Sequence, residues 1–151
     1  MTREFVLRGK TASGKQEVLN FGGHKTGYAF RMTEFQIYPS TNIATVNQEL
    51  AATVTAAKTY EDPSNPNFKN EGLIATALFF PSGLSTPGSM VPYSVVNDTF
   101  LITQNLIIAV IDTVSGSPAD VNWQCRFESV KMSGPEQAVT NYKQFQISDG
   151  S

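Results

Sequence analysis

Short apolar segments separated by clusters of Gly, Pro, Asn and Ser run along most of the chain. Helical periodicity is scarce, whereas alternation of apolar and polar residues with a period of two recurs, which is typical of β-strands joined by turns. The Ala/Thr-rich segment 48–57 is also compatible with a short helix, although we favour a strand. We expect strands at residues 4–8, 15–21, 28–38, 48–57, 72–80, 94–96, 99–103, 106–113 and 121–132.

The clearest alternation lies in residues 121–132, where polar residues at 122, 124, 126 and 128 separate apolar ones. This is the pattern of an antiparallel strand with one face in the core. Parity reverses at Val130 and Met132, so we expect a β-bulge near Ser129. The predicted core residues of this strand are Val121, Trp123, Cys125 and Phe127.

A second phase change lies within residues 28–38. Phe30 and Met32 share one face of the strand, while Phe35 and Ile37 have the opposite parity. Side chains alternate along a strand, so a regular strand cannot bury both pairs on one side. A bulge near Thr33-Glu34 would restore the phase.

These elements predict an all-β fold. Without repeated strand-helix units a parallel α/β sheet is not expected, and we find no internal repeat or domain linker. The 151 residues suit one domain, 1–151. We expect an antiparallel β-sandwich of about eight strands with jelly-roll topology. A short C-terminal helix is expected from Pro135, near a helix start, and from the spacing of Ala138, Tyr142 and Phe145.

Composition excludes several classes of protein. The chain has 11 Lys and Arg against 13 Asp and Glu, a net charge of -2, and no basic stripe, so nucleic-acid binding is not expected. The longest apolar run, residues 106–111, is far shorter than the roughly 20 residues that span a membrane. The N-terminus lacks the apolar core of a secretory signal. We therefore expect a soluble protein without a membrane segment.

Residues 9–16, GKTASGKQ, have the G-x-x-x-x-G-K spacing of a phosphate-binding P-loop. A P-loop places Ser or Thr after the Lys to hold Mg²⁺, and Gln16 cannot supply that hydroxyl. Two glycines also interrupt the following segment before it reaches the length of the helix that would face the phosphates. We instead expect a hairpin turn in which Gly14 serves backbone geometry.

Candidates for other chemistry are few. His24 is the only histidine and Cys125 the only cysteine, so neither a Cys/His nucleophilic pair nor a zinc site is expected. Asp112 and Asp120 could hold calcium across the turn at 115–118, but solvated loop carboxylates are the simpler interpretation. We predict no catalytic residue, no metal site and no cofactor.

Three segments carry a resemblance to known proteins: the block Phe100–Val110, the strand 121–132 and the short helix after it. They resemble small jelly-roll virion proteins of bacteriophages, especially marine ones, such as coat, minor capsid and decoration proteins. The resemblance covers the C-terminal third. It implies a non-enzymatic structural role, with copies of the chain or other virion proteins as partners. It also implies assembly in the host cytoplasm and a final location in the virion.

On this interpretation the long Pro-containing loops, 58–70 and 81–92, contact neighbouring subunits. Their apolar anchors would be Phe68, Leu84, Met90 and Tyr93. The same loops could also be ordinary surface loops. A carbohydrate- or receptor-binding module, using Tyr60, Phe68 and Tyr93 to stack sugars, is the alternative function, and a β-fold hydrolase with convergent acids is a third.

Overall fold

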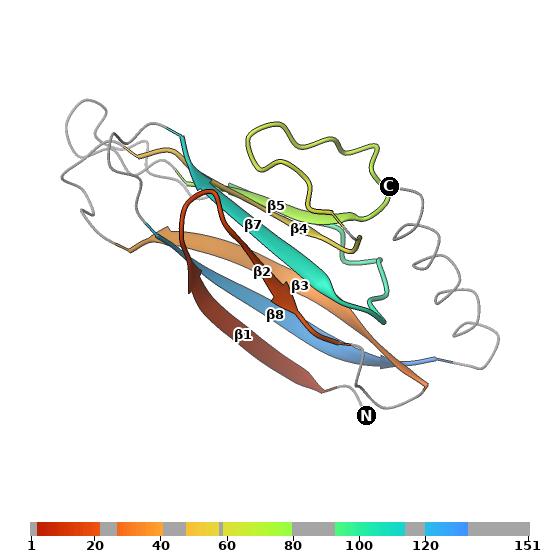
Figure 1. The fold of residues 1–151 in the computed structure, drawn as a ribbon. Coiled ribbons are helices and arrows are strands. Elements are labelled where there is room, and N and C mark those ends of the chain that lie inside the picture. Colours follow the sequence, from red (N-terminus) through yellow and green to blue (C-terminus); the bar gives the residue numbers. More distant parts are fainter. Residues whose placement is uncertain are drawn as a thin grey trace.

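The computed structural model describes residues 3–21, 27–40, 48–57, 59–79, 93–113 and 120–132. These residues form two antiparallel sheets that pack as two layers (Figure 1). The three-stranded sheet has the order β1-β8-β3 and the five-stranded sheet the order β2-β7-β4-β5-β6. The strands are β1 (Glu4–Thr11), β2 (Gln16–Leu19), β3 (Tyr28–Pro39), β4 (Leu50–Thr55), β5 (Leu73–Phe79), β6 (Tyr93–Val96), β7 (Leu106–Asp112) and β8 (Val121–Lys131).

The pairing of the strands is nested. The first strand, β1, pairs with the last, β8; β2 pairs with β7, and β4 with β5. Between β6 and β7 the chain runs beside β3, where Phe30 and Ile102 exchange two backbone hydrogen bonds of 2.9 and 2.7 Å. A chain folded back on itself in this way and wrapped into two sheets is a jelly roll. The expected all-β sandwich is therefore confirmed, and the expected strand 99–103 is reduced to this single bridge.

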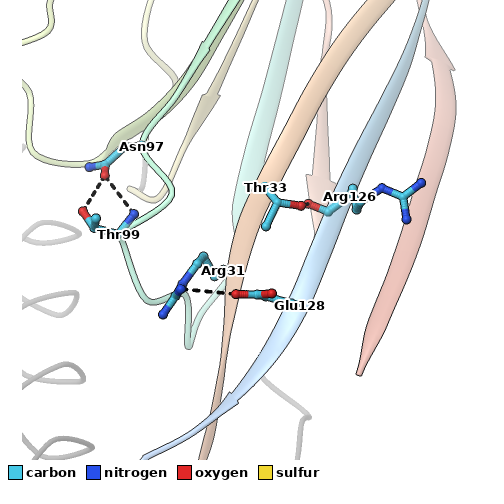
Figure 2. A network of polar contacts seen from close by, with 6 residues as sticks. All are labelled: Arg31, Thr33, Asn97, Thr99, Arg126 and Glu128. Carbon is cyan, nitrogen blue, oxygen red and sulfur yellow. Dashed lines mark hydrogen bonds and ion pairs between the residues drawn. The ribbon is translucent and has the colours of Figure 1, made fainter. Parts of the chain in front are cut away.

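One of the two expected bulges is present. The register between β3 and β8 shifts between Met32 and Glu34, so Thr33 is the extra residue (Figure 2). The bulge expected near Ser129 is wrong, because β8 pairs without a shift there and Phe30 lies opposite Ser129. The parity change at Val130 has another cause: this side chain lies half-buried on the outer face of the sheet.

The core lies between the two sheets. From β8 it contains Val121, Trp123, Cys125 and Phe127, all of which are buried. Large side chains from the other layer meet them; among these, Leu50, Val54, Ile74, Leu106, Ile108 and Val110 are fully buried. Burial of this apolar area is the main favourable contribution to folding.

Four phenylalanines form a closed cluster within the core. Phe127 stacks on Phe5 with ring centroids 5.4 Å apart, and Phe5 meets Phe30 edge-on at 5.5 Å. Phe21 completes the circuit, because its ring lies 5.1 Å from both Phe30 and Phe127. Three rings come from β1, β3 and β8, and Phe21 lies two residues after the end of β2, so this four-phenylalanine cluster joins the three-stranded sheet to the segment that follows β2.

Trp123 forms a polar link between the two sheets. Its Nε1–H donates to the Thr11 hydroxyl at 2.9 Å, and that hydroxyl donates to the Glu17 carboxylate at 2.6 Å. The three residues lie on β8, β1 and β2. The indole N–H therefore has a partner although the ring is buried, as a buried Trp requires. The ring also covers Gly9, its cross-strand neighbour.

The segment GKTASGKQ forms a turn without a phosphate cradle. Gly14 has a φ of 80°, and the Lys15 N–H donates to the Ala12 carbonyl at 3.0 Å. The turn is not a hairpin, because β1 and β2 belong to different sheets and each pairs with another strand. The Gly14 N–H itself donates to the carbonyl of Val110 at 2.9 Å, so this turn carries the chain from one layer to the other.

Several expected features lie outside the described residues. These are the C-terminal helix, the turn at 115–118, His24, Leu84 and Met90. Across the described ranges, no helix is long and apolar enough to cross a membrane.

Candidate functional site

The loop between β4 and β5 lies across the outer face of the five-stranded sheet (Figure 1). Two threonines of β4, both fully buried, hold it there. The Thr53 hydroxyl donates to the Glu61 carbonyl at 2.6 Å, and the Glu61 N–H donates to the Thr55 hydroxyl at 3.1 Å. These bonds satisfy hydroxyl groups that would otherwise be costly to bury. They also fix the position of the loop on the sheet.

Acidic side chains order the rest of this loop. The Glu61 carboxylate accepts hydrogen bonds from the Asn67 N–H at 2.9 Å and from the Asn70 side chain at 2.7 Å. Asp62 accepts from the Ser64 hydroxyl at 2.7 Å and from its N–H at 2.9 Å. The hydroxyl bond, followed by the backbone bond, lowers the pKa of Asp62 because both favour the ionised carboxylate. These acids therefore serve loop structure.

The ordered loop forms one wall of a hollow beside β5 and β6. The hollow has a volume of about 370 Å³. Phe68 of the loop lines it together with Leu78, Tyr93 and Val95, and these side chains are 65%, 40%, 65% and 39% exposed. Leu78 lies directly opposite Tyr93 in the β5–β6 ladder, so both point to the outer face. We call Phe68, Leu78, Tyr93 and Val95 the apolar face.

The apolar face consists of side chains suited to packing contacts, and the groups around it bear on whether it could also supply a nucleophile or bind a metal. Among the described residues that line its hollow, Glu49 carries the one carboxylate, and none is histidine or cysteine. In the part of the chain that the structure describes, no three His, Cys, Asp or Glu side chains lie close enough together to hold a metal ion. Asp112 is buried at the end of β7, where its carboxylate accepts the Glu49 N–H at 3.4 Å.

Cys125 is buried among apolar side chains, and this burial raises the pKa of its thiol to about 12. The thiolate is the reactive form. At pH 8 we expect Ellman's reagent to label native Cys125 at least on the order of a thousandfold more slowly than an exposed thiol. Urea-unfolded protein should react rapidly with one equivalent. Rapid labelling of the native chain would contradict the burial.

The same burial makes stability depend on pH. Because the folded state holds the thiol proton of Cys125 more tightly than the unfolded state does, the contribution of this thiol to the free energy of unfolding should fall as pH rises above 9.

The chain aligns with viral proteins of solved structure at low sequence identity. No family model matches the sequence, and no curated protein matches it. A chain of Turnip Yellow Mosaic Virus, solved at 100 K, aligns with a TM-score of 0.42 and 11% identity over 87% of this chain and 93% of its own. A chain of Desmodium yellow mottle tymovirus aligns with a TM-score of 0.44 and 10% identity over 87% of each. The jelly-roll assignment itself rests on the strand pairings given above.

The structure places two of the four expected contact residues together. Phe68 and Tyr93 both line the apolar hollow, whereas Leu84 and Met90 lie outside the described residues. Tyr60, the third aromatic residue expected to stack sugars, is exposed but lines a different hollow, next to Gln16 and Asp62. The aromatic side chains therefore do not share a single groove.

Sequence reasoning missed Leu78 and Val95. Leu78 lies in the nearly continuous apolar run of β5, where no alternation marks the outward side chains. Val95 reaches the same face because it pairs with Thr76. The short alternation of β6 gives no indication of which strand it joins.

Proposed function

We propose that this chain is a non-enzymatic structural subunit of a virus particle, acting through repeated protein–protein contacts. The apolar face is the contact surface, and a second copy of the chain is its partner. The observation that carries the proposal is the convergence of four exposed apolar side chains, from one loop and two strands, around a single hollow. Contiguous apolar surface of this kind marks interaction sites on folded proteins.

The surroundings of the apolar face suit association. The loop that borders it presents the neutral polar residues Ser64, Asn65 and Asn67, which are exposed. Neutral polar groups cost less to desolvate than charged ones. The threonine contacts under Glu61 fix the loop before binding, so little order has to be gained on contact. Closed symmetry would then repeat one modest contact many times.

The viral part of the proposal rests on the resemblance of the C-terminal third to virion proteins. The aligned chains come from Turnip Yellow Mosaic Virus and Desmodium yellow mottle tymovirus, so we propose a virion role without restricting it to bacteriophages. Major capsid, minor capsid and decoration roles all use such a contact. In each of them the chain would be located in the virion, with no cofactor.

Light scattering across protein concentration and salt tests the proposal. We expect the wild-type chain to form oligomers. Phe68→Asp or Tyr93→Asp should raise the protein concentration at which oligomers form at least tenfold, because a buried carboxylate without a partner opposes contact between subunits. Val18→Asp is the matched control, since Val18 is 59% exposed on β2, at the opposite edge of the same sheet. It should leave assembly within twofold of wild type.

Two results would overturn this proposal. One is a monomer at every concentration and salt, which would exclude self-association as the main activity. The other is equal loss of assembly in Val18→Asp and Phe68→Asp, which would show that the apolar face is not the contact.

A further inference from the structure

Another hollow, of about 330 Å³, lies on the other layer of the sandwich, over the three-stranded sheet. The outward side chains that line it are Arg8, Gln124, Gln36, Asn122 and Tyr38; Ile37 and Trp123, which point into the core, complete the lining together with Gly9. Its volume falls at the lower end of the range for small-molecule sites. It shares no residue with the apolar face.

The strand register arranges these side chains in two rows across the sheet. One row runs Arg8, Gln124, Gln36, and the next runs Lys10, Asn122, Tyr38. Alternate residues on a strand lie about 7 Å apart and neighbouring strands about 4.8 Å apart. The two rows therefore cover roughly 7 by 10 Å, which is the footprint of one or two sugar rings.

Among the residues that the structure describes, no acidic side chain stands in these two rows, whereas the rows further along the same face contain ion pairs. Further along the sheet, Arg31 pairs with Glu128 at 3.2 Å (Figure 2), and Arg126 pairs with Glu34 at 3.5 Å. Arg8 instead donates its Nε–H to the neutral Oε1 of Gln124 at 2.6 Å. The two rows contain two cationic side chains and no acid.

Several side chains of the hollow contact neighbouring groups. The bond to Gln124 orients the Arg8 guanidinium along the sheet, and the Asn122 amide donates to the Pro39 carbonyl at 3.4 Å. The Tyr38 ring, 51% exposed, meets the Phe79 ring at a centroid distance of 5.5 Å and an angle of 60°. A guanidinium offers parallel N–H donors to a carboxylate, amides pair with hydroxyl groups, and a fixed ring gives an apolar wall.

We propose that this hollow binds a carboxylated saccharide, such as a uronic or sialic acid residue. In this arrangement Arg8 binds the sugar carboxylate, Gln36, Gln124 and Asn122 bind hydroxyl groups, and Tyr38 packs against the ring. A single-stranded nucleic acid fits less well. It requires a longer basic track, and the next rows along the sheet introduce Glu34, Glu128 and Glu4. The inference does not depend on subunit assembly through the apolar face.

Titration of the purified chain with N-acetylneuraminic acid and with glucuronic acid tests the proposal. Glucose is the neutral control. Binding can be followed by the fluorescence of Trp123, the only tryptophan, which lines the hollow, and by calorimetry. We expect at least one acidic sugar to bind at least tenfold more tightly than glucose. Arg8→Gln should weaken that binding at least tenfold, because it removes the charged hydrogen bonds.

Arg126→Gln is the matched control variant, because it removes the same charge from the same face but outside the lining of the hollow. It should leave the sugar affinity within twofold. Equal binding of acidic and neutral sugars, equal loss in the two variants, or no binding of either acid would overturn the proposal. A ten-nucleotide thymidine strand is titrated in parallel. If it binds through Arg8 while the sugars do not, the site belongs to nucleic acid and the saccharide assignment is wrong.

Discussion

Replacement of Phe127 by alanine is expected to lower the free energy of unfolding by about 3–5 kcal/mol, the usual cost of deleting a fully buried phenylalanine. Phe127 has no exposed surface and contacts two of the other rings in the four-phenylalanine cluster. Two of the remaining rings lie on strands of the same sheet as Phe127, and the third, Phe21, lies just beyond β2, so the cavity can close only if separate segments of the chain move. Aromatic pairing adds to the loss. Urea denaturation followed by circular dichroism measures the change.

Phe68→Ala is the matched control for this substitution. The deletion is identical, but Phe68 is exposed on a loop. At protein concentrations where the chain is monomeric, we expect its free energy of unfolding to stay within about 0.5 kcal/mol of wild type. For Phe127→Ala the midpoint of thermal unfolding should fall on the order of 10 °C. A similar shift in both variants would contradict the position of Phe127 in the core.

Gly9→Ala should also destabilise the fold, by about 1–3 kcal/mol, the usual cost of overpacking. A β-carbon on Gly9 would lie 2.3 Å from Cζ2 and 2.7 Å from Cε2 of Trp123. The indole ring cannot move away easily, because it is buried and its N–H is held by Thr11. In most strands glycine to alanine is favourable by roughly 0.5–1 kcal/mol, so the expected sign is the reverse of the usual one.

A double-mutant cycle separates the ring contact from any backbone effect. If the indole is the obstacle, Gly9→Ala should cost less in a Trp123→Leu background, with a coupling energy of about 0.5–3 kcal/mol. Lys10→Ala, which changes the neighbouring exposed residue of β1, should have little effect. Additive costs for Gly9→Ala and Trp123→Leu would show that the ring is not what excludes a side chain at position 9.

Local pattern was sufficient for the parts of the fold that depend on one strand alone. The alternation around Trp123 predicted which side chains enter the core, and the phase conflict between Met32 and Phe35 predicted the bulge of β3. The same argument failed at Ser129. An apolar residue such as Val130 can lie half-buried on the outer face of a sheet, so a change of parity does not require a bulge.

The two candidate sites depend on register between distant strands, which one sequence does not reveal. Phe68 and Tyr93 could be selected because each is an aromatic residue in or beside a loop. Their meeting with Leu78 depends on how β5 and β6 pair. Likewise, Arg8 and Gln36 share a row only because both pair with Gln124, about ninety to one hundred and twenty positions away in sequence. Long-range pairing of this kind leaves no local pattern.

The nested pairing has a consequence for synthesis of the chain. Glu4 pairs with Glu128, so β1 has no partner in its sheet until β8 leaves the ribosome. The β4–β5 pair joins segments close in sequence, and we expect it to form first, because short loops cost less entropy to close. Until β8 arrives, β1 and β3 expose unpaired edges of the kind that promote aggregation. Productive folding of this chain should therefore depend on how soon β8 follows β1 out of the ribosome and on chaperones that shield the unpaired strands.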